Sequence, residues 1–474
     1  MRRYYFTLLI LAAAFNLKAQ EPIRNYSYTF KIANLPDSID SIAFMANYYG
    51  NKQYYFDTAV FEPGGVIRFS GDSIMGGIYS IILQDKKSYF EFVVNEPAIE
   101  METVAGNLVK GMKVKTSVEN KNFYEYLTFI ETKSLKAESL KKKLDGESEK
   151  EKEAAKEQLQ VIDSEVIGYK KEFIQNHPDL FISKVFKASE EPEVADYKEI
   201  ENEEERNKKR YLEFKKVYLD NVDFGDERLL RTPVLHNKFI YYLTKLTPQN
   251  PDSINATADL LAEMARPSKE VFKYVVHTIT TKYEDSQIMG MDAVLVHMGQ
   301  TYYCSGQVWW LSEKKKKEFC ERIEKMAPLL LGNKAPNLIL QDTANKWYQL
   351  YKVNSPYTVL YFWDSGCGHC KKVTPKLKEF YEAYKDKGIE VFAVGTEFET
   401  EEWKAYIKKN ELPWINVSDN PEYPSNFRDS YDIFSTPKVY LLDADKKIIA
   451  AKLMPEQLGE FIDHQMEEDS KKTK

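Results

Sequence analysis

Two cysteines that stand two residues apart are the part of this sequence best suited to chemistry. The stretch 362–375 reads FWDSGCGHCKKVTP and holds Cys367 and Cys370 on either side of Gly368 and His369. An apolar run precedes Cys367 and a helical pattern follows it, so we expect Cys367 at a helix start, where free N–H groups and the helix dipole favour a thiolate. Cys370, one turn further on, could then attack a mixed disulfide formed on Cys367. The pattern predicts a thiol–disulfide exchange site, beside which His369 could place a positive charge.

Two other uses of this cysteine pair fit the sequence less well. A zinc site needs a second ligand pair, but Cys304 and Cys320 are separated by fifteen residues rather than two. A purely structural disulfide would close a loop so short that it stabilises the fold little. We therefore predict no metal and no bound cofactor at Cys367 and Cys370, only a redox-active disulfide.

The remaining cysteines leave two alternatives open. Ser312 is a suitable cap for a helix that contains Cys320, and Cys304 ends the preceding helical stretch. Antiparallel neighbouring helices would bring the two sulfurs together, and a disulfide would then add about 3 kcal/mol of stability. Two buried free thiols are the alternative, and the sequence does not decide between them.

The N-terminus indicates where the chemistry takes place. Arg2-Arg3, the apolar run 6–15 and the stretch Leu17-Lys18-Ala19-Gln20 have the layout of a secretory signal peptide covering residues 1–20. The apolar run is too short for a membrane-spanning helix, although an uncleaved anchor is the alternative. We expect the mature protein to be exported and soluble.

Length and composition suggest about three domains and exclude one class of partner. The chain has 474 residues, of which 43% are hydrophobic, enough for several packed cores. Its formal charge of −7 argues against a nucleic-acid partner, which would require clustered Lys and Arg.

The first predicted domain, 21–116, is rich in strands. Seven aromatic and β-branched segments are separated by turn residues, which favours a small antiparallel β-sandwich. The segments are YSYTFKI (26–32), SIAFMANYY (41–49), QYYFDTAVF (53–61), VIRFSG (66–71), GIYSIIL (77–83), YFEFVV (89–94) and AIEMETV (98–104). This region contains no histidine and no cysteine, so we expect no chemistry in it.

The second predicted domain, 117–328, has a helical and strongly charged pattern. A run of alternating Lys and Glu at 133–160 is broken at Asp145-Gly146, and such alternation is typical of a solvated helical face. An apolar stripe then recurs at helical spacing and should face a partner helix. Its members are Leu159, Ile162, Val166, Tyr169 and Phe173. The four histidines of this region lack metal-ligand spacing, so an all-α accessory domain is expected.

The third predicted domain, 329–474, alternates apolar strands with helices. A hairpin is expected at 337–351, followed by strands at 358–363, 389–394, 414–417, 438–442 and 447–452 and by helices after the cysteines, at 400–409 and at 456–466. Strand–helix alternation predicts an α/β fold with a mainly parallel sheet and helices on both faces.

This last region resembles the thioredoxin fold, and specifically the exported TlpA/ResA-like thiol–disulfide oxidoreductases. The residues that carry the resemblance are Phe362-Trp363, Cys367-Gly368-His369-Cys370, Pro375 and Thr436-Pro437, together with the extra hairpin. The resemblance implies that Pro437 is cis and faces the dithiol, and that Thr436 presents its backbone to an extended substrate. It also implies a periplasmic location, disulfide-containing envelope proteins as partners, and a membrane electron donor. The upstream regions resemble accessory domains of unassigned function.

The sequence departs from the family at two positions that usually hold an acid. Tyr361 stands six residues before Cys367, and Val373 stands three residues after Cys370. In the family such acids help to deprotonate the second thiol, so we expect slow resolution of the mixed disulfide, or assistance from water or Asp364. Gly368-His369 is the pair found in disulfide isomerases, so the motif does not fix the direction of electron flow; the family favours reduction.

These observations predict a periplasmic thiol–disulfide oxidoreductase with an N-terminal β-sandwich-like domain, a central all-α domain and a C-terminal thioredoxin fold. The alternative is an envelope binding or scaffold protein in which the thioredoxin domain is secondary. An accessible C-x-x-C dithiol favours the enzyme, because a scaffold does not need one. The client proteins and the oligomeric state do not follow from the sequence.

Overall fold

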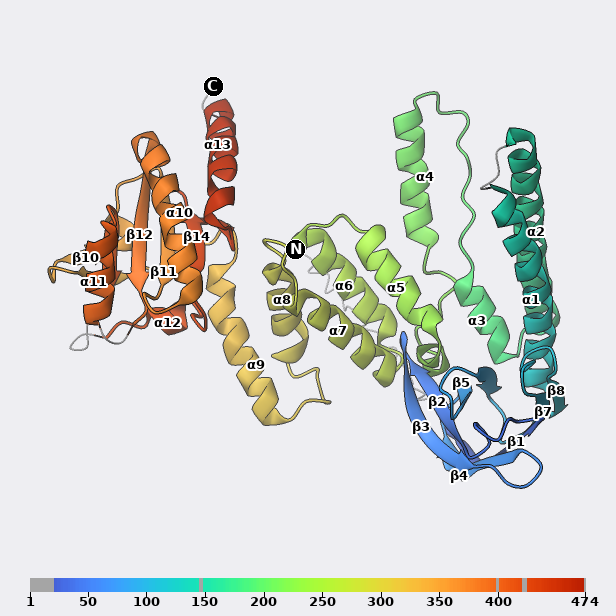
Figure 1. Ribbon diagram of the computed structural model, residues 1–474. Helices are drawn as coiled ribbons and strands as arrows, with labels where there is room; N and C mark the ends of the chain where they lie inside the picture. The colour runs from blue at the N-terminus through green and yellow to red at the C-terminus, as the bar shows by residue number, and fades with distance from the viewer. Residues whose placement is uncertain (1–20, 145–147, 398–399, 420–423, 473–474) are drawn as a thin grey trace, which may run out of the picture. The chain divides into compact units, whose positions relative to one another are not determined.

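The computed structural model describes residues 21–144, 148–397, 400–419 and 424–472 (Figure 1). The predicted signal peptide and the predicted helix break at Asp145-Gly146 lie outside these residues. The chain divides into two compact units, which are Met1–Pro248 with Asp259–Val275, and Gln249–Ala258 with Val276–Lys474. The predicted domain boundaries near residues 116 and 328 remain predictions.

In the first unit, eight strands form two four-stranded sheets, in the orders β4-β1-β7-β8 and β3-β2-β5-β6. The strands are β1 (Ile23–Ala33), β2 (Ile42–Tyr49), β3 (Lys52–Val60), β4 (Val66–Ile74), β5 (Gly77–Leu83), β6 (Tyr89–Val94), β7 (Ala98–Val104) and β8 (Lys113–Thr116). The ring of Phe30 in β1 contacts Phe90 and Phe92 in β6, with centroids 5.5 and 4.9 Å apart, so aromatic side chains connect the two sheets.

One pairing differs from the predicted antiparallel arrangement. β1 and β7 run parallel, with Tyr28 opposite Ile99. The two strands are far apart in the sequence, so no tight turn forces them to run in opposite directions. Each of the seven predicted segments is a strand, and β8 is an addition that the sequence pattern did not predict.

Helices follow the sheets, as the sequence predicts. They are α1 (Val118–Leu144), α2 (Glu149–Asn176), α3 (Phe181–Ser189), α4 (Glu203–Val217), η1 (Glu227–Arg231), α5 (Pro233–Lys245), α6 (Pro251–Ala265), α7 (Lys269–Glu284), α8 (Asp292–Met298), η2 (Gly299–Tyr303), α9 (Glu313–Met326) and η3 (Ala327–Leu329). The predicted apolar stripe on α2 faces α1, where Ile162 is buried in one cluster with Leu140. None of the described helices is long and apolar enough to cross a membrane.

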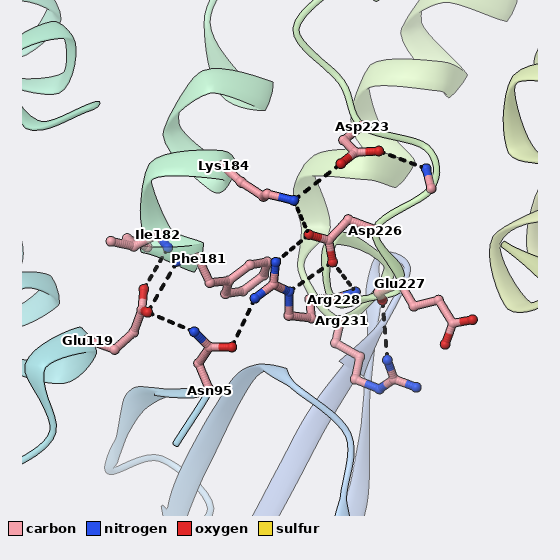
Figure 2. A network of polar contacts seen from close by, with 11 residues as sticks. Asn95, Glu119, Phe181, Ile182, Lys184, Asp223, Asp226, Glu227, Arg228 and Arg231 are labelled. Atoms are coloured by element: carbon pink, nitrogen blue, oxygen red, sulfur yellow. Dashed lines mark hydrogen bonds and ion pairs between the residues drawn. The ribbon is translucent and has the colours of Figure 1, made fainter. Parts of the chain in front are cut away.

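A buried polar network links the sheets to the helices within the first unit (Figure 2). Glu119, at the start of α1, is only 1% exposed and accepts hydrogen bonds from the backbone N–H groups of Phe181 (3.1 Å) and Ile182 (2.7 Å) at the start of α3. The Glu119 carboxylate also accepts a hydrogen bond from the side-chain amide of Asn95 at 3.0 Å. The side-chain oxygen of Asn95 in turn accepts a hydrogen bond from Arg228 at 2.9 Å. Burial raises the pKa of Glu119. Because the first N–H groups of a helix lack intrahelical partners, this carboxyl group stabilises α3.

The second unit contains a seven-stranded sheet in the order β10-β9-β13-β12-β11-β14-β15. Its elements are β9 (Ile339–Asp342), β10 (Trp347–Gln349), η4 (Leu350–Lys352), β11 (Tyr357–Trp363), α10 (Gly368–Tyr384), η5 (Lys385–Lys387), β12 (Ile389–Gly395), α11 (Thr400–Asn410), β13 (Ile415–Ser418), α12 (Phe427–Ser430), β14 (Lys438–Leu442), β15 (Ile448–Ala451) and α13 (Pro455–Lys472). The predicted hairpin, strands and helices are present.

The prediction of a mainly parallel sheet was wrong. The pairs β11–β12 and β12–β13 are parallel, whereas β10–β9, β9–β13, β11–β14 and β14–β15 are antiparallel. Strand–helix alternation predicts parallel pairing only where a crossover helix joins neighbouring strands. Here short turns connect β9 with β10 and β14 with β15, which requires these neighbours to be antiparallel.

The centre of this sheet is β11, which positions the cysteines. Every residue of β11 is buried. On one face Val359 and Tyr361 pack in a cluster with Leu377 of α10 and Leu458 of α13. On the other face Phe362 packs against α12, with its ring stacked on Phe427 at 5.9 Å. A strand fixed on both faces gives a rigid base for the loop that follows it.

Candidate active site

Cys367 lies at the start of α10, as the sequence predicts. It is the N-cap residue of this helix, and its Sγ accepts the backbone N–H of Cys370 at 3.4 Å. The preceding turn is closed by Asp364, whose Oδ1 accepts the N–H groups of Gly366 (2.6 Å) and Cys367 (3.1 Å). Cys367 is partly exposed, between the exposed residues Gly366 and Gly368. The turn therefore presents this sulfur to solvent at a helix N-terminus.

The two thiols of this pair have opposite pKa shifts. Burial is the largest single influence on the pKa of Cys367 and raises it. Hydrogen bonds from Cys370 and, more weakly, from the side chain of Thr436 and the backbone of His369 together outweigh burial, so the pKa of Cys367 is lowered. Cys370 is only 1% exposed, and burial raises its pKa to about 12. Both thiols are free. One accessible thiol thus ionises easily, while the thiol beneath it stays protonated.

A cis proline stands opposite the dithiol, as the resemblance implies. The Thr436–Pro437 peptide bond is cis, and the carbonyl of Thr436 accepts the Sγ–H of Cys367 at 3.4 Å. The pairing of β14 with β11 sets this position, because Lys438 lies opposite Phe362 and the preceding residues run along the cysteine loop. The backbone of Thr436 thus contacts the sulfur of Cys367.

The two positions near Cys370 where the resemblance implies an acid are occupied by Tyr361 and Val373, and neither side chain carries a carboxylate. The Tyr361 hydroxyl forms a hydrogen bond with the Thr374 hydroxyl at 2.9 Å, and Thr374 donates to the Cys370 carbonyl at 2.8 Å. Burial is the main cause that raises the pKa of Tyr361, so its phenol stays neutral. Val373 is 3% exposed and packs in the same core cluster as Cys370. Neither residue can act as a base at neutral pH.

The structure also places a carboxyl group that the sequence analysis missed. Glu397, just after β12, accepts the backbone N–H of Ser365 in the cysteine loop, and burial raises the pKa of Glu397. Asp364, named as a substitute base, instead accepts the backbone N–H groups of its own turn. No motif marks Glu397, because its role depends on the pairing of β12 with β11.

The other residues singled out from the sequence lie in three places. Trp363 is 1% exposed and forms part of the core below the loop, and His369 is exposed on the first turn of α10. Pro375 lies inside α10. Cys304 and Cys320 form a disulfide between the end of η2 and α9, with Cα atoms 5.7 Å apart. Of the two alternatives for this pair, the structure shows the disulfide.

Comparisons with known proteins agree with this geometry. A family described as thioredoxin-like matches residues 354–448, and a domain family of unknown function matches residues 147–327. The chain is similar to the thiol-disulfide oxidoreductase ResA of Bacillus cereus (27% identical over 133 residues, covering 28% of this chain and 75% of ResA). It is also similar to ResA of Bacillus thuringiensis (29% over 142 residues, covering 30% and 78%).

Among solved structures, a domain of a possible thiol-disulfide isomerase from Cytophaga hutchinsonii is 44% identical, with a TM-score of 0.29, and covers 31% of this chain and 99% of that domain. The matched region and its cysteine pair define the class of thioredoxin-like thiol–disulfide oxidoreductases. Within that class, the C-terminal region is similar to the TlpA/ResA type.

Proposed function

We propose that Cys367 and Cys370 are the redox centre, and that the protein reduces disulfides of envelope proteins in the periplasm. The observation that carries the proposal is the asymmetry of the pair, in which Cys367 is partly exposed with a lowered pKa and Cys370 is buried with a pKa raised to about 12. A thiolate is the nucleophile in disulfide exchange, so Cys367 attacks first.

The reaction then proceeds in two displacements. The Cys367 thiolate attacks one sulfur of the client disulfide; a mixed disulfide forms, and the other client sulfur leaves as a thiolate that takes up a proton. Cys370 next loses its proton and attacks the Sγ of Cys367. The client leaves with two thiols, and Cys367 and Cys370 are left as a disulfide. Two electrons pass to the client, so each cycle requires a two-electron donor, which we assign to a membrane carrier.

The backbone of Thr436 orients the client. Its carbonyl accepts the Cys367 thiol at 3.4 Å, and ionisation of Cys367 removes the proton that makes this bond. An extended client segment can then pair with the backbone beside the cis proline, in the manner of an added strand. Such backbone pairing holds the client disulfide near Cys367 and does not depend on the side chains of the client.

The experiment that tests this function uses single-cysteine variants. Cys370→Ser should capture a disulfide-bonded client protein as a stable mixed disulfide, visible as a reductant-sensitive mass increase, because no second thiol can resolve it. Cys367→Ser should capture nothing, since the buried Cys370 cannot reach a client. Equal capture by both variants, or by neither, would reject the assignment.

A further inference from the structure

Phe434, next to the active site, is exposed to an unusual degree. Its side chain is 84% exposed, more than any other large apolar side chain among the described residues. An aromatic side chain left in water forgoes roughly 2–3 kcal/mol of burial free energy. A single exposed apolar residue is ordinary on a protein surface, so its position and its surroundings decide whether it has a role.

The backbone on both sides of Phe434 is fixed. Ile433 donates its N–H to the carbonyl of Arg428 at 2.8 Å, and its side chain packs against the core. The ammonium group of Lys438 donates to the carbonyls of Tyr431 at 2.8 Å and Asp432 at 3.0 Å. The segment is therefore anchored before and after Phe434, and Ile433 is partly buried while Phe434 is left in solvent.

Phe434 is also close in sequence to the residue that contacts Cys367. Phe434 stands two residues before Thr436. The carbonyl of Thr436 accepts a hydrogen bond from the thiol of Cys367. On the neighbouring strand Lys452 donates its N–H to the carbonyl of Val439 at 3.2 Å, so the chain beyond Lys452 continues toward the same end of β14. There Met454 is 44% exposed. Two exposed apolar side chains thus lie at the cis-proline end of the β14–β15 hairpin.

We propose that Phe434 is a specificity-determining residue, which favours client disulfides with an apolar side chain two residues from the attacked cysteine. The inference rests on the proposed function. Residues in extended chains advance by about 3.3 Å each, so in a client paired with the backbone at Thr436 a side chain two residues away lies about 7 Å along the strand, and Phe434 is two residues from Thr436 in this chain. Aromatic residues that become buried on binding commonly dominate the energy of an interface.

The test compares reduction of two peptides that contain the same intramolecular disulfide. They carry either Leu or Ser two residues from the attacked cysteine, and bis(2-hydroxyethyl) disulfide serves as a probe too small to reach Phe434. The second-order rate constant for oxidation of the reduced wild-type protein by the Leu peptide should be about fivefold or more above that by the Ser peptide. Phe434→Ala should reduce this preference below about twofold and leave the small-disulfide rate unchanged, while Phe434→Leu should retain most of the preference.

A matched control comes from the same sheet. Ile339 of β9 is 53% exposed, and β13, β12 and β11 separate β9 from β14 in the sheet order, so Ile339→Ala should leave all three rates unchanged. If the wild type reduces the small disulfide but does not distinguish the peptides, or if Phe434→Ala keeps the preference, the role of Phe434 is rejected and the redox function stands. If the wild type reduces none of the three probes, the proposed function itself fails.

Discussion

At the scale of single residues, we expect the second thiol, Cys370, to lose its proton without help from a neighbouring acid. Tyr361 and Val373 stand at the two positions where the resemblance to TlpA/ResA-like proteins implies an acid, and the phenol of Tyr361 stays neutral. The proton of Cys370 therefore has no described carboxylate at either position to receive it. Because the pKa of Cys370 is raised to about 12, its thiolate is scarce at pH 7, and we expect the resolving step to be slow.

A substitution at Val373 tests this expectation. Val373→Glu places a carboxylate one helical turn from Cys370, and the mixed disulfide should then decay about tenfold faster or more, as general-base catalysis permits. The same change should lower stability by about 1–3 kcal/mol, because Val373 is buried in the core. Stopped-flow measurement of mixed-disulfide decay gives the rate.

The matched control for this change is Val373→Gln, which has nearly the same shape and no base. It should lose similar stability and gain no speed. An unchanged decay rate in Val373→Glu would show that the missing acid does not limit resolution.

At the scale of elements, the strands and the cysteine position could be predicted from the sequence, and the sheet pairings only in part. The pattern of apolar and turn residues predicted the positions of β1 to β7. The predicted place of Cys367 at a helix start is confirmed, because Cys367 directly precedes α10. The parallel pair β1–β7 and the antiparallel edges of the second sheet depend on contacts between distant segments, which local patterns do not encode. The same reason applies to Glu397 and Phe434, which are loop residues whose roles arise only when strands meet.

The packing of β12 against α11 provides a prediction about an element. A Cβ atom added at Gly395 would lie 2.5 Å from Nε1 of Trp403, a side chain that is 1% exposed and has no room to move. Gly395→Ala should therefore lower the stability of the second unit by about 1–3 kcal/mol. All six tryptophans lie in this unit, so tryptophan fluorescence during urea unfolding reports on it directly.

A double variant serves as the control for this prediction. Trp403→Phe makes room for the new methyl group, so Gly395→Ala combined with Trp403→Phe should be less destabilised than the sum of the two single changes. Strict additivity would contradict the proposed clash.

At the scale of the whole molecule, one chain contains two pairs of cysteines with different surroundings. Cys304 and Cys320 form a disulfide in the helical part, whereas Cys367 and Cys370 are free. A lasting disulfide is typical of proteins outside the reducing cytoplasm, which supports the proposed export. One pair thus has a structural role, and we propose the redox chemistry for the other.

The different reactivities of Cys367 and Cys370 can be measured as the rate at which iodoacetamide modifies each cysteine of the whole protein as a function of pH. The protein is first treated with just enough reductant to open the Cys367–Cys370 disulfide, and the modified residues are identified by peptide mass spectrometry. Cys367 should react with an apparent pKa below the ordinary value of about 8.5, because its thiolate is stabilised. Cys370 should remain unmodified up to a pH near its own pKa of about 12, and Cys304 and Cys320 should stay joined. Equal reactivity of Cys367 and Cys370, or an apparent pKa of Cys367 above the ordinary value, would contradict the proposed roles of the two thiols.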